Sequence, residues 1–227
     1  MVVAMSANDG HDHGPGEHEA GLVHDGPAFF DQAAGSWDDD PAKVERARVV
    51  AEQIVEQLDP SSDARLFEYG AGTGLVAQHL QDHVGALTLA DNSAGMRHAM
   101  ADKVGDGRLP GATRIWDLDL ATQALPAGER FDLAVTVQVL HHVHDLAPVL
   151  AGFAALLEPG GHLCIVDLEQ EDGTFHGDGF GGHHGFRRDQ LGEQLGAAGF
   201  VGVTFQHSYD LEKNGHAYPL FLAIATR

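Results

Sequence analysis

Short apolar runs alternate with amphipathic stretches along most of this chain, and this alternation limits the fold more than any other feature. The apolar runs indicate strands near residues 65–69, 86–90, 112–116, 131–137 and 162–167. The stretches between most of them indicate helices near residues 74–84, 93–104 and 145–157. Strands that alternate with helices form a parallel sheet covered by helices on both faces. The sequence therefore predicts an α/β domain.

The two ends of the chain depart from this alternation. Residues 1–27 are rich in glycine, histidine and acidic residues without apolar periodicity, so we expect a mobile tail before a single folded domain over 28–227. An amphipathic helix is predicted over 41–58, with proline at its first position. After a helix near 187–198, the apolar runs at 201–207 and 218–226 follow each other directly. Two consecutive strands indicate an antiparallel pair that closes the sheet.

Charge and cysteine content narrow the class of protein. The net charge is −21, from 34 acidic and 13 basic residues, and this excess repels phosphate backbones, so we expect no nucleic-acid partner. Cys164 is the single cysteine, which excludes an internal disulfide and a cysteine-rich zinc site. No run approaches the roughly 20 apolar residues of a membrane span, and no basic residue precedes Lys43, unlike a signal peptide. We expect a cytoplasmic protein; its oligomeric state is not predicted.

A glycine-rich turn follows the first predicted strand. Its residues are Gly70, Ala71, Gly72, Thr73 and Gly74. Glycines let the backbone turn sharply beside a ligand, and the helix that follows offers free N–H donors. Leu75 occupies the place of the last glycine of G-x-G-x-x-G, so the dinucleotide-binding pattern is not met. Glu68, two residues before the turn, suits a cationic ammonium group better than a pyrophosphate.

Acidic residues end the next two predicted strands. Asp91 lies 21 positions after the first glycine of the turn, where a carboxylate can accept hydrogen bonds from both hydroxyls of a ribose. The alternative is a helix cap, since Asn92 and Ser93 also begin a helix; the glycine turn upstream favours the ligand role. At the end of the third strand, Asp117 could accept from an adenine amine while Leu118 packs on the ring. A simple turn at that strand end remains an equal alternative.

These motifs occur in the order typical of class I S-adenosylmethionine (SAM)-dependent methyltransferases, which the chain resembles over residues 28–227. The segments that carry the resemblance are Glu68 to Gly74, Asp91, Asp117-Leu118, residues 131–143 and residues 157–161. The likeness is strongest to the small-molecule branch that includes ubiquinone/menaquinone-biosynthesis C-methyltransferases. It implies a Rossmann-like seven-stranded, mostly parallel sheet with helices on both faces and a C-terminal antiparallel strand pair. It also implies SAM as the cofactor and a small-molecule acceptor.

The resemblance further implies roles for individual residues. The glycine turn would line the methionine moiety, Asp91 the ribose and Asp117-Leu118 the adenine, while Gln138 would face the cofactor from the fourth strand. The segment from Phe30 to Trp37 is similar to the N-terminal lid of this branch. The expected cofactor-binding residues are Phe30, Trp37, Glu68, Gly70, Ala71, Gly72, Thr73, Gly74, Asp91, Asn92, Met96, Asp117, Leu118 and Gln138. No metal site is expected. Residues 167–187 depart from the quinone-enzyme pattern, in the region that usually shapes the acceptor pocket.

Histidines are the candidate bases. Methyl transfer is an in-line displacement, so alignment and exclusion of water supply much of the rate, and a base is needed only if the nucleophile must lose a proton of high pKa. The candidates are His141, His142, Asp167, His176, His183 and His184, of which the four histidines at 141, 142, 183 and 184 are the predicted catalytic residues. Packing or polar lining is the alternative for each. We expect the acceptor pocket at the carboxyl ends of the first, fourth and fifth strands, capped by residues 30–37 and 170–186.

Other functions are compatible with parts of the pattern. Amino-methylating nucleic-acid enzymes carry an Asp/Asn-Pro-Pro-aromatic stretch where this chain has Gln138-Val139-Leu140-His141, and Cys164 lies in an apolar strand rather than in a nucleophile loop. An NAD-dependent oxidoreductase is one alternative, which Leu75 disfavours. A non-catalytic metal-binding protein is another, suggested by the 16 histidines, although no tight ligand spacing occurs in the folded part. A relative that binds cofactor without transferring methyl groups is the third.

Overall fold

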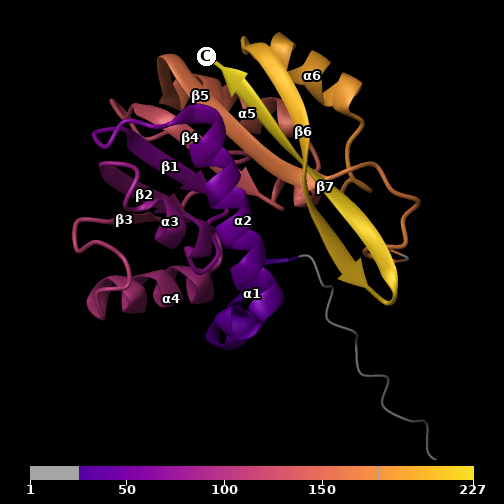
Figure 1. Ribbon diagram of the computed structural model, residues 1–227, viewed down its shortest axis with the longest axis horizontal. Coiled ribbons are helices and arrows are strands. Elements are labelled where there is room, and N and C mark those ends of the chain that lie inside the picture. Colours follow the sequence, from indigo (N-terminus) through magenta and orange to yellow (C-terminus); the bar gives the residue numbers. More distant parts are fainter. Residues whose placement is uncertain (1–25, 178) are drawn as a thin grey trace, which may run out of the picture.

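A seven-stranded sheet with helices on both faces forms the body of the protein in the computed structural model, which describes residues 26–177 and 179–227 (Figure 1). The strands are β1 (Arg65–Tyr69), β2 (Ala86–Ala90), β3 (Arg114–Trp116), β4 (Phe131–Val137), β5 (Leu157–Leu168), β6 (Val201–Lys213) and β7 (His216–Thr226). The α-helices are α1 (Pro27–Ala33), α2 (Pro41–Leu58), α3 (Leu75–Leu80), α4 (Ala94–Gly105), α5 (Leu146–Leu156) and α6 (Arg188–Ala197). Two 3-10 helices are η1 (Ala34–Asp39) and η2 (Leu140–His142).

The sheet has the order β3-β2-β1-β4-β5-β7-β6. The first five strands of this order pair in parallel, and β7 runs antiparallel to both β5 and β6. This confirms the predicted parallel sheet with a C-terminal antiparallel pair. Because β1, β2 and β4 are parallel neighbours, the loops that follow them emerge at the same edge of the sheet, which is where ligands bind in open α/β folds.

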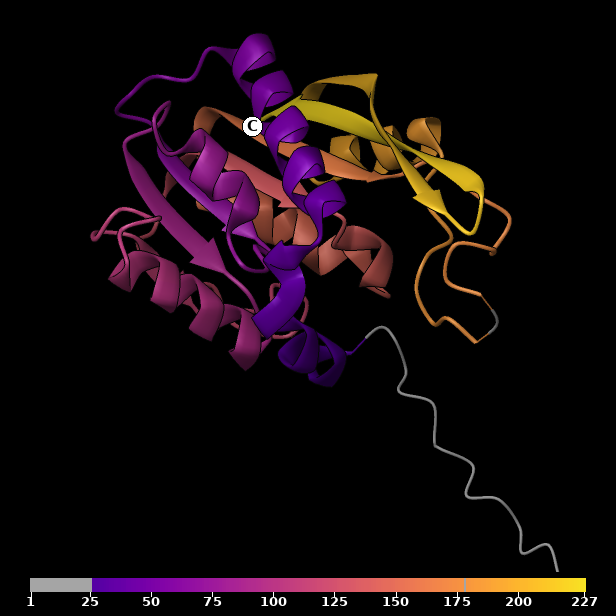
Figure 2. The same ribbon diagram turned by 60° about the horizontal axis from the view of Figure 1, so that its bottom comes forward.

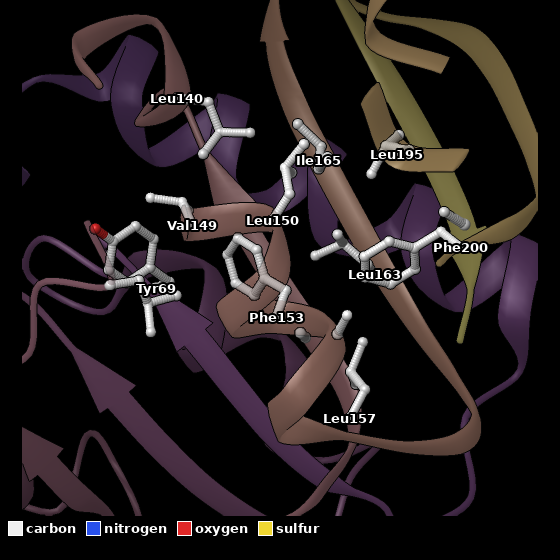
Figure 3. Packing of buried hydrophobic residues seen from close by; sticks show 14 of the residues in the cluster. Tyr69, Leu140, Val149, Leu150, Phe153, Leu157, Leu163, Ile165, Leu195 and Phe200 are labelled. Atoms are coloured by element: carbon white, nitrogen blue, oxygen red, sulfur yellow. The ribbon is translucent and has the colours of Figure 1, made fainter. Parts of the chain in front are cut away.

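A hydrophobic cluster lies on each face of the sheet. On one face α5 packs Val149, Leu150 and Phe153 in the same cluster as Leu163 and Ile165 of β5 (Figure 3). On the other face, α2, α3 and α4 contribute to the second cluster. Burial on both faces explains why the central strands are almost continuously apolar. No helix in residues 26–177 and 179–227 is long and apolar enough to cross a membrane.

The C-terminal strands are longer than predicted. β6 and β7 pair as far as Lys213 and His216, with register shifts between Val201 and Thr204 and between His207 and Tyr209. A tight turn through Asn214 and Gly215, both with positive φ (54° and 78°), joins the two strands. Asn-Gly is the sequence preferred in two-residue hairpin turns. β5 also begins earlier than predicted, because Leu157 already pairs with β4 across an irregularity in register. Cross-strand pairing therefore extends these strands into polar residues, which the apolar runs in the sequence do not mark as strand.

Two short helices precede the predicted domain core. α1 and η1 occupy the segment that the sequence marks only by its aromatic residues, and α1 lies beside α4 (Figure 2). Pro27, predicted as the last residue of the tail, is instead the first residue of α1, where proline is favoured because no intrahelical N–H bond is lost. The remaining prediction of a mobile tail lies outside the described residues, except at Gly26.

Candidate functional site

The glycine turn links β1 to α3 with three residues in the left-handed region. Gly70, Gly72 and Gly74 have φ values of 66°, 57° and 79°, which residues with a Cβ rarely adopt. A Cβ on Gly70 would meet the Cγ2 of Val139, beyond the end of β4, at 2.3 Å. A Cβ on Gly72 would meet nothing within 4 Å. The turn is thus packed against the segment that follows β4 on one side and open at its centre, as a cradle for a ligand would be.

Asp91 at the end of β2 organises this turn. Its carboxylate accepts hydrogen bonds from the backbone N–H groups of Gly72 and Ser93, both at 2.8 Å. Burial raises the pKa of Asp91, and these two bonds act against that shift. The N-cap of α4 is Ser93, whose Oγ accepts from the Met96 N–H, so Asp91 is not the cap. Each carboxylate oxygen keeps a further acceptor position, which suits the ribose hydroxyls of the predicted cofactor.

Glu68 is a buried carboxyl group beneath the same turn. Its Oε2 has no hydrogen-bond partner among the described residues. Burial raises the pKa of Glu68 to about 8, although the backbone of Ala77 and the charge of Lys103 act to lower it. A buried carboxylate without a partner is costly, and a cation beside it lowers that cost. This position therefore fits the ammonium group of SAM.

Replacing Glu68 by glutamine tests this burial through the pH dependence of stability. The folded state holds the proton up to about pH 8, whereas the unfolded chain releases it near the ordinary value of 4.5. The contribution of the Glu68 carboxyl group to the free energy of unfolding is complete below pH 4.5 and is lost as the pH rises towards 8. We expect the free energy of unfolding of Glu68→Gln minus that of the wild type to rise by about 1.4 kcal/mol per pH unit between these limits.

Chemical denaturation at pH 5, 6, 7 and 8 measures this difference. Glu129→Gln is the matched control, because Glu129 is partly exposed and pairs with Arg114. Its difference from the wild type should stay flat over the same range. Parallel curves for Glu68→Gln and the wild type would show that the carboxyl group is already charged in the folded protein.

The N-terminal segment lies over the glycine turn and is held there by two aspartates. Asp31 accepts from the Ser93 Oγ at 2.6 Å, at the start of α4. Asp38 accepts from the Thr73 Oγ1 at 2.5 Å and pairs with the Lys103 Nζ at 2.7 Å. Lys103 is only 1% exposed, and burial lowers its pKa. Sequence reasoning missed both aspartates and the lysine; the repeated aromatic-Asp pairs in this segment, Phe30-Asp31 and Trp37-Asp38, were the available signal.

The residues expected at the adenine differ in their exposure. Asp117 is 62% exposed at its side chain and pairs with Arg97 at 3.0 Å. Arg97 also donates to the backbone oxygen of Asp91 at 2.9 Å, so one arginine bridges the ends of β2 and β3. Leu118 and Met96 are buried, at 3% and 1% exposure, with Leu118 in a hydrophobic cluster. Sequence reasoning missed Arg97, which carries no motif of its own.

Three further predicted cofactor residues lie around the turn. Gln138 follows β4 with a φ of 56°, a left-handed conformation that is unusual outside glycine, and its N–H donates to the Val166 oxygen at 2.7 Å. Strained backbone of this kind concentrates at functional sites. Asn92 is exposed, and Ala71 is buried, with its N–H donating to the oxygen of Ala90.

His141 and Asp167 form a buried pair at the carboxyl ends of β4 and β5. The Nδ1 of His141 lies 2.6 Å from the Oδ1 of Asp167, and the His141 backbone N–H also faces this carboxylate at 3.3 Å. Both side chains are buried. A carboxylate on Nδ1 holds the proton there and leaves Nε2 as the free nitrogen of the ring. This is the arrangement that prepares a histidine to accept a proton or to bind a metal ion.

His142 lies directly beside this pair. Its ring centroid is 4.1 Å from that of His141. Burial lowers the pKa of His142 to about 4, with the charge of His141 acting in the same direction and that of Asp167 against it. The His142 ring is therefore neutral near pH 7. The ring of Phe30, from α1, packs edge-on against it at 5.8 Å between centroids, and so the N-terminal segment reaches this site.

The loop over residues 170–186 covers the histidine pair from the other side. The His183 N–H donates to the backbone oxygen of His141 at 2.7 Å. A Cβ on Gly182 would lie 2.1 Å from the same oxygen, so only glycine allows this approach. His176 stacks on Phe180 with ring centroids 3.8 Å apart, and its ring lies 5.1 Å from that of His141.

The predicted catalytic histidines thus occupy different places. His141 and His142 lie at the centre of the site, with His176 beside them. His183 packs its ring against Phe186, and His184 is 44% exposed and pairs with Glu171 at 3.2 Å. The structure therefore brings the fourth strand end, the N-terminal segment and the 170–186 loop together, and it leaves His183 and His184 at the margin of the cluster.

This chain is similar to known proteins over most of its length. A family model described as "Methyltransferase domain" matches residues 43–206. An uncharacterized methyltransferase of Schizosaccharomyces pombe is 28% identical over 203 residues, which cover 86% of this chain and 64% of the relative. Fumosorinone synthetase of Cordyceps fumosorosea is 30% identical over 171 residues, covering 66% of this chain and 4% of that protein. The chain thus spans less than two thirds of the length of these curated relatives.

A solved structure shares the fold at low sequence identity. Phosphoethanolamine N-methyltransferase 2 of Haemonchus contortus, in complex with phosphomonomethylethanolamine and S-adenosylhomocysteine, has a TM-score of 0.66 at 12% identity. The match covers 78% of this chain and 52% of that one. These matches do not support the narrower resemblance to ubiquinone/menaquinone-biosynthesis enzymes, which stays a prediction.

Proposed function

This chain belongs to the methyltransferase domain family, and from that premise we propose that it transfers a methyl group from SAM to a small-molecule acceptor held at the His141–Asp167 pair. The family match disfavours an oxidoreductase and a purely metal-binding protein. When bound, SAM supplies a methyl group activated by its sulfonium. Asp91 would hold the ribose, Glu68 the ammonium group and the open cradle at Gly72 the methionine moiety between them.

The main observation that supports an acceptor site here is the buried His141–Asp167 pair. Asp167 keeps the Nδ1 of His141 protonated, so the Nε2 lone pair can take a proton from the acceptor as its nucleophile attacks. The same carboxylate stabilises the imidazolium that this transfer creates. Asp167 is itself buried, which strengthens the interaction between the two groups.

The N-terminal segment and the 170–186 loop cover this pair from two sides, which favours a small acceptor. Phe30 reaches His142 from the N-terminal segment, and the 170–186 loop bonds to the backbone of His141. Closure from two sides excludes water from the sulfonium. The excess of acidic residues speaks against a nucleic-acid acceptor. The lone buried thiol of Cys164 is compatible with a cytoplasmic location.

Transfer of a labelled methyl group from SAM tests the proposal. Pools of small molecules would be offered by nucleophile: phenols and alcohols, amines, thiols, and enolisable carbonyl compounds including quinone precursors. We expect label in one pool with the wild type and at least tenfold less with Asp167→Asn, because an amide in place of the carboxylate no longer orients the imidazole. Label that appears only on RNA, DNA or protein would contradict a small-molecule acceptor, and equal label with Asp167→Asn would contradict the role of the pair.

A further inference from the structure

We propose that His141, His142 and His176 together bind one divalent transition-metal ion at the acceptor site. One ring nitrogen from each of the three lies within 4.8 Å of the others. Metal–nitrogen bonds of about 2.0–2.1 Å in a tetrahedral site place such nitrogens roughly 3.4 Å apart, so the three rings would draw closer together when the ion binds. The sequence does not mark these three histidines as one site, because His176 comes from the loop after β5 while the other two follow β4.

Asp167 supplies the support that metal-binding histidines usually have. Its 2.6 Å contact with the Nδ1 of His141 directs the Nε2 of that ring to the ligand role. A carboxylate behind a histidine fixes the orientation of the ring and makes the metal-bound nitrogen more basic. Asp167 also brings a negative charge into the buried surroundings of the cation.

The other two ligands are held in place by their surroundings. The Nδ1 of His142 is buried and has no hydrogen-bond partner in the part of the chain that the structure describes, and a bond to a metal ion would satisfy it. His176 is positioned by its stacking on Phe180, with ring planes 9° apart. The turn before it is organised by Glu171, whose Oε2 accepts from the N–H groups of Gly173 and Phe175.

Three imidazole ligands leave an open coordination position, as in catalytic rather than structural zinc sites. Imidazole donors suit Zn²⁺, Co²⁺, Ni²⁺ and Fe²⁺ better than Mg²⁺ or Ca²⁺. This inference rests on the proposed function for its chemistry. An acceptor hydroxyl bound at the open position would lose its proton to water; its oxygen would then form the new bond to the methyl carbon as the methyl–sulfur bond breaks and S-adenosylhomocysteine leaves. The Nε2 of His141 has one lone pair, so in the metal-bound protein the cation replaces His141 as the group that activates the acceptor.

Metal binding is tested on the full chain after removal of metal by a chelator. Zn²⁺ would be titrated by calorimetry, and Co²⁺ by its visible absorption, which reports the coordination geometry. We expect one ion per chain. His142→Ala and His176→Ala should each weaken binding at least 100-fold, and Asp167→Asn 10- to 100-fold.

Two controls separate this site from other histidines. His144→Ala alters an exposed histidine three positions after His141 and should leave the affinity within twofold. The full-length variant His11→Asn/His13→Asn/His18→Asn/His24→Asn should also bind the ion normally. Binding that disappears in this N-terminal variant, or that survives His176→Ala, would overturn the proposed site. Thermal melting checks that each variant is folded.

Methyl transfer by the metal-free protein distinguishes the two proposals. Transfer that stops on chelation and returns with Zn²⁺ or Co²⁺ supports both. Transfer that persists in a protein that binds neither ion overturns the metal site and leaves His141 as the base. One bound ion per chain, lost in His176→Ala, without transfer to any acceptor supports the metal site and contradicts the proposed function.

Discussion

Replacing His141 by alanine is expected to lower the rate of methyl transfer at least 100-fold while the affinity for SAM changes less than twofold. Loss of a positioned base costs about 10²- to 10⁴-fold in rate. The cofactor side of the site should be spared, because Glu68, Asp91 and the glycine turn lie on other elements. As a metal ligand or as a base, His141 is needed for the same step, so this result tests the site rather than the choice between the two roles.

Steady-state kinetics and calorimetry with SAM measure the two effects separately. His183→Ala and His184→Ala are the matched comparisons, since both histidines lie on the covering loop at the margin of the cluster. We expect less than a fivefold loss of rate for either one. A larger loss from these variants than from His141→Ala would move the catalytic role to the loop.

Replacing Asp91 by alanine is expected to weaken SAM binding at least tenfold, which corresponds to about 1.4 kcal/mol or more. Charge-assisted hydrogen bonds to the ribose would be lost. The variant also removes the acceptor for the N–H groups of Gly72 and Ser93, so the glycine turn loses a contact that holds its shape before the cofactor arrives. Both effects weaken the binding of SAM.

Two controls accompany this variant. Asp82→Ala removes the same charge at an exposed position and should leave SAM affinity unchanged. Asp91→Asn keeps one acceptor oxygen and should fall between alanine and the wild type. Unchanged affinity for Asp91→Ala in a folded protein would show that Asp91 only supports the backbone.

Most of the architecture could be predicted because local sequence patterns indicate its strands and helices. Alternating apolar runs predicted β1, β2 and β4 to the residue, since buried parallel strands need continuous apolar sequence. The glycines of the turn and Asp91 were predicted to lie together, because a turn after one parallel strand and the end of the next meet at the same edge. α1 and η1 were missed as helices, since seven and six residues are too few for a period to show.

The long-range contacts of the site were beyond this kind of reasoning. The burial of Lys103 beside Asp38 depends on where the N-terminal segment comes to lie, and a lysine in a helix is ordinarily solvated. The bridge that Arg97 forms between β2 and β3 likewise carries no motif.

The strands, the glycine turn and the acids at the strand ends could be predicted because each is marked by residues a few positions apart along one strand, helix or turn. Which histidines come together depends instead on how the strands and loops pack. His141 meets Asp167 because β4 and β5 are neighbours, and His176 joins them because its loop folds back over the same edge. Such contacts join residues whose separation along the chain has no fixed period, so side-chain packing in three dimensions selects them.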